Sequence, residues 1–210
     1  YSKFMLKSDD LINKVKSYNK FLNPETLDKA YNFAVKAHEN QKRHSGDPYV
    51  IHPVAVANIL TELKLDSATI ATGLLHDTIE DTHATYQTIK DEFGQEVADL
   101  VEGVTKISEL ENQATANSRA ENFRKLIIAT SKDIRVLLVK IADRLHNMRT
   151  ISSIDKIEKR ERIAKETMEI YSPLADRMGM NRIRDELEDL SFSVLNKPAR
   201  DLILHRLQFI

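Results

Sequence analysis

The chain has 210 residues, of which 41% are hydrophobic and 30% charged, and this apolar content is enough for a folded core and excludes a disordered chain. Its formal net charge of −1 argues against a general nucleic-acid binder, because such proteins need a basic surface. It contains no cysteine, so disulfides and thiolate metal sites are excluded. Any bound metal must therefore use imidazole and carboxylate ligands.

No segment reaches the roughly 20 consecutive apolar residues that a membrane-spanning helix needs. The first six residues, YSKFML, lack the basic region and long apolar stretch of a signal peptide. We therefore expect a soluble, cytoplasmic protein with no membrane partner. Nothing in the sequence indicates the oligomeric state.

The predicted secondary structure is helical. The chain has only five glycines and five prolines, and its apolar residues recur at intervals of three and four rather than two. Asn23 and Pro24 predict a helix start, since asparagine caps helix N-termini and proline suits the first helical position. Further helices are predicted near Pro53 and after Asp66, and a pair of short helices is predicted to flank Gly94.

The most apolar segment, residues 132–151, is predicted to run through the centre of the domain. Two segments interrupt the helical pattern. Residues 42–49 (KRHSGDPY) predict a tight polar loop, and residues 108–118 (SELENQATANS) predict a polar, mobile one. The pattern as a whole favours a single all-α domain, a bundle of about ten helices.

The adjacent pair His76-Asp77 is the first candidate for chemistry. The helix before it is apolar, so the pair is predicted at the end of a buried helix, where a carboxylate is costly unless it is paired or metal-bound. Glu80 and Asp81 follow one turn later on the same helix faces, and these four groups would repel one another without a cation. The alternative is an exposed acidic helix end, which opposes the helix dipole but is tolerated in water.

A second candidate lies in the most apolar helix, where Asp143 and Asn147 are one helical turn apart. A carboxylate in such a helix needs a metal ion or an ion pair to offset its desolvation. Arg144 and Arg149 are the candidate partners if the role of Asp143 is structural.

A third candidate is His52, directly before Pro53 at a predicted helix start. Alone, a histidine there is more often a local hydrogen-bonding residue than a ligand. Together, His52, His76, Asp77 and Asp143 form a set of two imidazoles and two carboxylates. Such a set suits Mn²⁺, Fe²⁺ or Zn²⁺ better than Ca²⁺ and leaves positions open for water and substrate.

The order H…HD…D is the pattern of the HD superfamily of phosphohydrolases, and longer strings make the resemblance more specific. Six strings resemble the hydrolase domain of RelA/SpoT-type alarmone enzymes: HSGDPYVIHP (44–53), LLHDTIEDT (74–82), GVTKI (103–107), VKIADRLHNMRT (139–150), YSPLADRMGM (171–180) and ELEDLSF (186–192). The resemblance covers residues 25–195, nearly the whole chain. It implies an HD-domain helical bundle.

The resemblance also implies an activity, the hydrolysis of the 3′-pyrophosphate of guanosine tetra- and pentaphosphate (ppGpp and pppGpp). The products are GDP or GTP and pyrophosphate, and the reaction ends the stringent response. The implied metal ligands are His52, His76, Asp77 and Asp143, with one Mn²⁺ per site as the family's usual ion and Fe²⁺ or Zn²⁺ as alternatives.

The remaining site residues are also implied by the resemblance. Glu80 and Asp81 match the acidic pair that positions or activates the attacking water. A carboxylate there can take the water proton or give one to the leaving 3′-oxygen, while a divalent cation neutralises the phosphates. Five residues match positions that hold the guanine nucleotide: Arg43, His44, Ser45, Asn147 and Thr150. Of these, Arg43 is implied to lie near the guanine base.

Some histidines receive other interpretations. His44 stands where bacterial members commonly have lysine, which would weaken or retune contact with the base or the phosphates. His38 matches a family position but lies on the apolar face of its helix, and it is interpreted as a core histidine with one hydrogen bond. His83, His146 and His205 are interpreted as structural or surface residues.

Residues 1–195 are predicted to form the hydrolase domain, and residues 196–210 a C-terminal helix that could begin a connection to a further domain. The chain is thus either part of a longer enzyme or a hydrolase-only member. Two other functions stay open: a phosphatase acting on NADPH or another nucleotide, and a catalytically silent, nucleotide-binding regulatory module. Silent members usually lose the His-Asp or Glu-Asp pair, and this chain has both.

Overall fold

The structure is a computed structural model that describes residues 5–20, 22–113, 123, 127–128 and 132–196. Within these ranges the chain is helical, with one isolated bridge between Lys42 and Pro48 and no strand, as the sequence predicts. The helical elements, in chain order, are α1 (Ser8–Lys16), α2 (Pro24–Ala37), α3 (Ile51–Glu62), α4 (Ser67–Leu75), α5 (Thr78–Asp81), α6 (Tyr86–Phe93), α7 (Gln95–Gln113), α9 (Ile134–Arg149), η1 (Ile151–Ser153), α10 (Ile157–Glu166), η2 (Thr167–Tyr171), α11 (Ser172–Arg177) and α12 (Asn181–Leu195).

Several helix starts follow from local side-chain caps. Asn23 Oδ1 accepts a hydrogen bond of 3.3 Å from the Thr26 amide at the start of α2. Asp66 Oδ1 does the same for the Thr69 amide at the start of α4, at 3.2 Å. These caps satisfy amides that have no partner inside the helix, so the predicted starts of both helices are confirmed.

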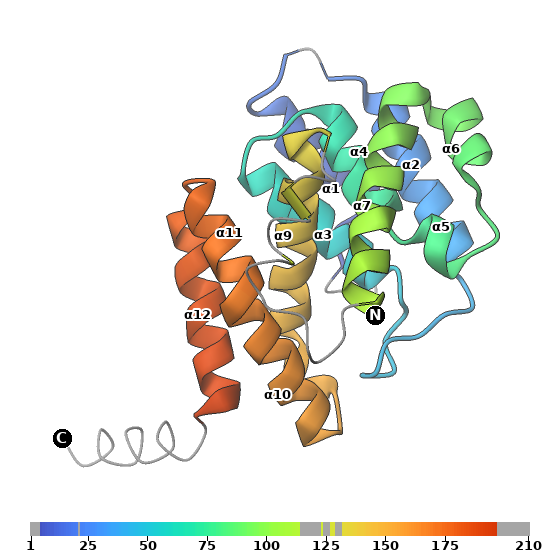
Figure 1. The fold of residues 1–210 in the computed structure, drawn as a ribbon. Coiled ribbons are helices and arrows are strands. Elements are labelled where there is room, and N and C mark those ends of the chain that lie inside the picture. Colours follow the sequence, from blue (N-terminus) through green and yellow to red (C-terminus); the bar gives the residue numbers. More distant parts are fainter. Residues whose placement is uncertain (1–4, 21, 114–122, 124–126, 129–131, 197–210) are drawn as a thin grey trace.

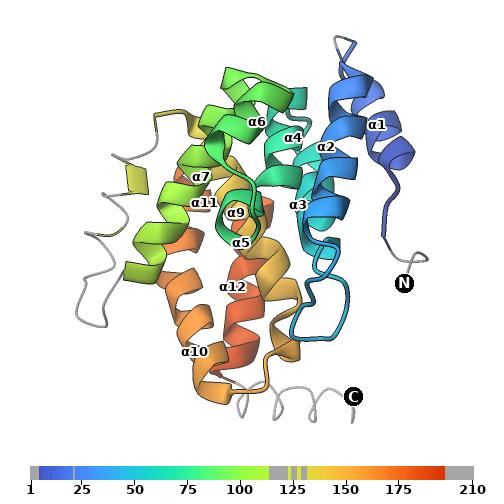
Figure 2. The same cartoon turned by 90° about the vertical axis from the view of Figure 1, so that its right-hand side faces the viewer.

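Helix α9 lies at the centre of the molecule, as its apolar sequence predicts. It packs against α3, α4 and α7 on one side and against α12 and η2 on the other. In Figure 1 it stands between the helices of the first half of the chain and the layer formed by α10, α11 and α12, and Figure 2 shows the same arrangement from the side. Buried side chains such as Val139, Ile141 and Leu145 form its contribution to the core.

Helices α3 and α4 pack closely against each other. A Cβ on Gly73 would lie 2.7 Å from Leu60 Cδ1, so only glycine permits this approach without rearrangement. The two helices are joined by a short connection and therefore run in opposite directions. This arrangement sets His52, in the first turn of α3, beside His76, directly after the end of α4.

The two predicted interruptions have different outcomes. Residues 42–49 form a loop, in which Gly46 adopts a φ of 86°, a conformation that favours glycine. The prediction of a loop over residues 108–118 is wrong for its first part, because α7 continues to Gln113. Leu110 packs against the core and Glu111 pairs with Lys140, and these contacts offset the polar composition. Residues 114–118 lie outside the described residues.

The predicted C-terminal helix at 196–210 falls almost wholly on residues 197–210, which lie outside the described residues. The division into residues 1–195 and 196–210 therefore stays a prediction. None of the described helices combines the length and the apolar character required to cross a membrane.

Candidate metal centre and adjoining pocket

His76 and Asp77 lie at the junction between α4 and α5. Helix α4 ends at Leu75, His76 caps its C-terminus, and Asp77 caps the N-terminus of the short α5. Both side chains are buried. The alternative of an exposed acidic helix end is therefore wrong for this pair. The helix is also interrupted there, rather than continuing through Asp81 as the sequence suggested.

The four predicted metal ligands come together in space. One ligand atom from each of His52, His76, Asp77 and Asp143 lies within 4.8 Å of the others, and all four residues are buried. His52 Nε2 is 2.6 Å from Asp143 Oδ1, and His76 Nε2 is 3.2 Å from the same oxygen. His76 Nε2 also lies 3.0 Å from Asp77 Oδ2. Two imidazole nitrogens and two carboxylate oxygens converging in this way fit a divalent metal ion.

Neighbouring groups fix the orientation of two of these ligands. His76 Nδ1 donates a 2.6 Å hydrogen bond to the Gly73 carbonyl, which turns Nε2 toward the carboxylates. Tyr49 OH lies 2.7 Å from Asp77 Oδ2 and 3.2 Å from Asp81 Oδ2. Burial and the negative charge of Asp77 raise the pKa of Tyr49, so its hydroxyl stays protonated and donates to these carboxylates.

Asp143 has an ion-pair partner that the sequence interpretation missed. Lys140 Nζ lies 3.0 Å from Asp143 Oδ2 and 3.1 Å from Glu111 Oε1. The two arginines considered for this role are engaged elsewhere: Arg144 pairs with Glu111 and Glu166, and Arg149 with Glu186. Lys140 thus holds one carboxylate oxygen of Asp143, while the other faces the two imidazoles.

His146 also contacts the cluster, although the sequence interpretation left it as a structural or surface residue. Its Nδ1 lies 2.7 Å from His52 Nδ1, on the side of the ring opposite Asp143. The side chain is buried, so it is not a surface residue. Its position three residues after Asp143, on the same face of one helix, was the available signal.

The remaining histidines follow their predicted roles where the structure describes them. His38 is buried, and its Nδ1 lies 2.8 Å from Gln41 Oε1, as expected for a core histidine with one hydrogen bond. His83 is exposed. His205 lies outside the described residues.

Burial and the neighbouring charges determine the protonation of the cluster. Burial opposes ionisation of Asp143, but Lys140 and the histidines hold its pKa well below the usual value. Burial likewise disfavours a charged His76, yet Asp77 and Asp143 raise its pKa well above the usual value. Burial lowers the pKa of His52 despite its contact with Asp143. A metal ion can therefore bind only by displacing the proton that His76 holds between two carboxylates.

Glu80 and Asp81 lie on α5, next to the cluster but outside its innermost contacts. Partial desolvation of the Glu80 carboxyl, together with the charge of Asp77, raises its pKa to about 7. Partial burial and Asp77 also raise the pKa of Asp81. Both residues border an open cavity of about 810 Å³ on the α2 side of the site.

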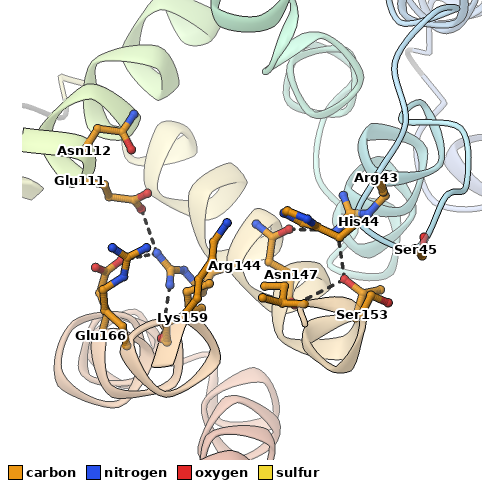
Figure 3. A pocket seen from close by; sticks show the side chains of 14 residues that line it. Arg43, His44, Ser45, Glu111, Asn112, Arg144, Asn147, Ser153, Lys159 and Glu166 are labelled. Atoms are coloured by element: carbon orange, nitrogen blue, oxygen red, sulfur yellow. Dashed lines mark hydrogen bonds and ion pairs between the residues drawn. The ribbon is translucent and has the colours of Figure 1, made fainter. Parts of the chain in front are cut away.

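A second cavity, of about 400 Å³, is lined by all five predicted nucleotide-binding residues: Arg43, His44, Ser45, Asn147 and Thr150. Arg43 Nη2 donates to Thr150 Oγ1 at 3.0 Å and to Asn147 Oδ1 at 3.3 Å. Figure 3 shows Arg43 and Asn147 on one side of this pocket and Glu111 and Glu166 on the other.

The pocket and the metal-ligand cluster meet at one side chain. Asn147 Nδ2 lies 3.5 Å from Asp143 Oδ1, and Asn147 Oδ1 accepts the hydrogen bond from Arg43. The pocket is also lined by the basic side chains Arg144, Lys159 and Arg162, of which Arg144 pairs with Glu111 and Glu166. The sequence indicated Arg144 only as a candidate partner of Asp143, and the charges of Lys159 and Arg162 are ordinary on an exposed helix face.

The fold and the cluster together define an all-helical domain with a buried two-histidine, two-aspartate metal centre beside a polar pocket. A family model described as an HD domain matches residues 30–181, which is well over half of the chain. The chain belongs to the HD-domain family.

Within this family, the chain is similar in sequence to several curated proteins. The chain is 52% identical over 203 residues to "GTP pyrophosphokinase rsh" of Brucella melitensis, covering 97% of the chain and 27% of that protein. It is 56% identical over 169 residues to "Bifunctional (p)ppGpp synthase/hydrolase SpoT" of Escherichia coli K12, covering 80% of the chain and 24% of that protein. The chain thus spans about a quarter of the length of these curated relatives.

One solved structure is similar along nearly its full length. Its title is "A metazoan ortholog of SpoT hydrolyzes ppGpp and plays a role in starvation responses". The two share 25% sequence identity and a TM-score of 0.60, and the match covers 87% of this chain and 98% of that one. The resemblance to RelA/SpoT-type proteins, first indicated by the motifs, is confirmed by these matches.

Proposed function

We propose that the chain is a metal-dependent hydrolase that removes the 3′-pyrophosphate of ppGpp and pppGpp, giving GDP or GTP and pyrophosphate. The observation that carries this proposal is the position of Asn147, whose side chain touches both Asp143 of the cluster and Arg43 of the pocket. A nucleotide held in the pocket would therefore present a phosphate group next to the metal ligands. The names of the relatives and of the similar structure support guanosine polyphosphates as substrates.

The metal centre is proposed to hold one Mn²⁺ through His52, His76, Asp77 and Asp143. A divalent ion at such a site supplies a Lewis acid that polarises phosphate oxygens and lowers the pKa of water. Tyr49 keeps the Asp77 carboxylate in place by a hydrogen bond, and Lys140 holds the Asp143 carboxylate in the same way. Both carboxylates are then pre-oriented, and little rearrangement is needed for binding.

Glu80 and Asp81 are proposed to act in proton transfer during the reaction. A carboxyl with a pKa of about 7 exchanges its proton near neutral pH. Glu80 is therefore suited to take a proton from the attacking water or to give one to the leaving 3′-oxygen. Asp81 shares the Tyr49 hydroxyl with Asp77, which links the acidic pair to the metal ligands.

The pocket residues are proposed to bind and orient the guanine nucleotide. The Arg43 guanidinium is anchored by Thr150 and Asn147, so its planar face is available for a purine base. His44 and Ser45 lie on the same loop and border the same cavity. Binding the nucleotide in one orientation would hold its 3′-pyrophosphate next to the catalytic groups, which lowers the entropic part of the activation barrier.

The test is a parallel assay of ppGpp, pppGpp and NADPH with Mn²⁺, Fe²⁺, Zn²⁺ and Mg²⁺. We expect pyrophosphate release from ppGpp and pppGpp, fastest with Mn²⁺. Turnover of NADPH alone would replace the alarmone assignment by a nucleotide phosphatase. Binding of ppGpp without pyrophosphate release by the metal-loaded protein would instead indicate a silent regulatory module.

A further inference from the structure

The contact between His146 and His52 is not used by the proposed reaction. The two Nδ1 atoms lie 2.7 Å apart, and the rings are inclined at 32° with their centroids 4.9 Å apart. Both side chains are buried. A hydrogen bond between two imidazoles requires that one of the two Nδ1 atoms carry a proton and that the other accept it.

We propose that His146 is a positioning residue for the metal centre, because it accepts the Nδ1 proton of His52 and thereby presents the unprotonated His52 Nε2 to the ion. This inference rests on the proposed metal centre at His52, His76, Asp77 and Asp143. It adds to the four proposed ligands a residue whose role is to orient one of them.

The tautomer of His52 is the first argument. A histidine binds a metal through a nitrogen lone pair, so a ligand Nε2 requires that the remaining ring proton sit on Nδ1. His52 Nε2 faces Asp143 Oδ1 at 2.6 Å, inside the cluster. His52 Nδ1 faces away from the cluster and meets His146 Nδ1. That atom is therefore the acceptor for the His52 proton whenever an ion is bound.

The geometry of α9 is the second argument. Asp143 and His146 are three residues apart, on one face of this helix. They contact the two opposite edges of the same imidazole, Nε2 and Nδ1. The ring of His52 is thus held between two side chains of one rigid helix, so its plane cannot rotate without breaking one of these contacts.

The other ligand histidine provides a comparison within the same site. His76 Nδ1 donates to the Gly73 backbone carbonyl at 2.6 Å, which sets the same tautomer by a main-chain acceptor. His52 lies in the first turn of α3, and its acceptor is a side chain instead. The tautomer of His52 can therefore be changed by a single substitution, while that of His76 cannot.

The experiment measures Mn²⁺ affinity of the whole 210-residue chain without nucleotide, by titration followed by electron paramagnetic resonance of the free ion. His146→Phe keeps a ring of similar shape but removes the acceptor, and we expect a roughly 10- to 100-fold weaker affinity. His146→Gln restores an acceptor oxygen and should recover most of the affinity. His83→Phe, which changes an exposed histidine, serves as the matched control and should bind Mn²⁺ like the unmodified chain.

A second measurement does not depend on the variants. In the Zn²⁺-loaded chain, ¹H–¹⁵N correlation spectra of the histidine rings should show His52 protonated at Nδ1 and the ring of His146 protonated at Nε2. Unchanged Mn²⁺ affinity in folded His146→Phe, or a His52 protonated at Nε2 in the Zn²⁺-loaded chain, would overturn the inference while leaving the metal centre in place. Failure of the unmodified chain to bind any divalent ion would overturn both the inference and the proposed metal centre.

Discussion

Lys140 and Asp143 form a buried ion pair one turn apart on α9, with Lys140 Nζ 3.0 Å from Asp143 Oδ2. Lys140 also pairs with Glu111 near the end of α7, so a single ammonium group joins the metal-ligand cluster to a second helix. Burial disfavours the charged form, but Glu111 and Asp143 raise the pKa of Lys140, which therefore stays charged.

The first prediction concerns this pair. Lys140→Met removes the ammonium group from the buried Asp143 carboxylate and leaves the half-buried Glu111 with Arg144 alone. We expect the free energy of unfolding of the metal-free chain to fall by about 3 kcal/mol. Urea denaturation measures the change. Lys106→Met, which removes an exposed i,i+4 pair with Glu102, is the control and should cost no more than about 1 kcal/mol. Equal effects of the two substitutions would show that Lys140 is not structurally important.

The second prediction concerns the metal ligands. Asp77→Asn should abolish metal binding and turnover together, since a neutral amide is a poor replacement for a carboxylate among these four ligands. Elemental analysis of the purified variant measures the metal content. Asp99→Asn, an exposed residue on α7 bonded to Tyr86, should keep the metal content of the unmodified chain. Full metal occupancy in Asp77→Asn would contradict the assignment.

The third prediction separates chemistry from binding. Glu80→Gln preserves the shape of the side chain but cannot exchange a proton, so kcat should fall by about 10²- to 10⁴-fold, the usual contribution of a general acid or base. Metal content and KM should change little. Single-turnover pyrophosphate release from ppGpp provides the measurement, and an unchanged kcat would remove Glu80 from the mechanism.

The fourth prediction is a pH dependence of stability for Glu80. Its pKa is raised from 4.5 to about 7 in the folded chain, mainly by partial desolvation and then by Asp77. The folded state therefore binds this proton more tightly than the unfolded state. The resulting stabilisation is fully present below the unfolded pKa and is lost as the pH rises through 7.

The measurement for this fourth prediction compares metal-free wild type with Glu80→Gln by urea denaturation across this pH range. The stability of the wild type relative to the variant should decline between about pH 4.5 and 7, because other groups contribute equally to both proteins. A constant difference across the range would mean that the pKa of Glu80 is not raised in the folded chain.

The fifth prediction concerns the pocket. Arg43→Ala removes the guanidinium that Thr150 and Asn147 anchor, and KM for ppGpp should rise by at least about tenfold, as for the loss of one charged hydrogen bond. Mn²⁺ affinity should stay unchanged. Steady-state kinetics measure the effect, with Lys165→Ala as the control, because Lys165 is a largely exposed cation. A matching loss in the control would point to a general effect of charge.

Several parts of the fold were predictable from local sequence. The helix starts at Asn23 and Asp66 follow from side-chain caps, and the central position of α9 follows from its apolar composition. The extension of α7 through Gln113 was not predictable. It depends on contacts of Glu111 with Lys140 and Arg144, which are distant in the sequence.

The candidate site divides in the same way. The identity of the four metal-ligand candidates was available from the sequence, because buried helices rarely carry unpaired carboxylates and histidines, and because their spacing resembles a known family. The residues that hold these ligands in place could not be predicted from the sequence. Lys140 and Tyr49 are ordinary residues in their own segments, and their importance comes only from where Asp143 and Asp77 lie.

An all-α chain with two histidines and two aspartates suited to a divalent ion follows from the amino-acid sequence, since helix periodicity and ligand chemistry are local properties. The tertiary structure decided which groups hold those ligands. Packing of α3 against α9 sets His52 between Asp143 and His146, and packing of α7 against α9 sets Lys140 between Asp143 and Glu111. Hydrogen bonds and ion pairs of this kind require atoms within about 3 Å, and distances between separate helices are fixed only by the packing of the core.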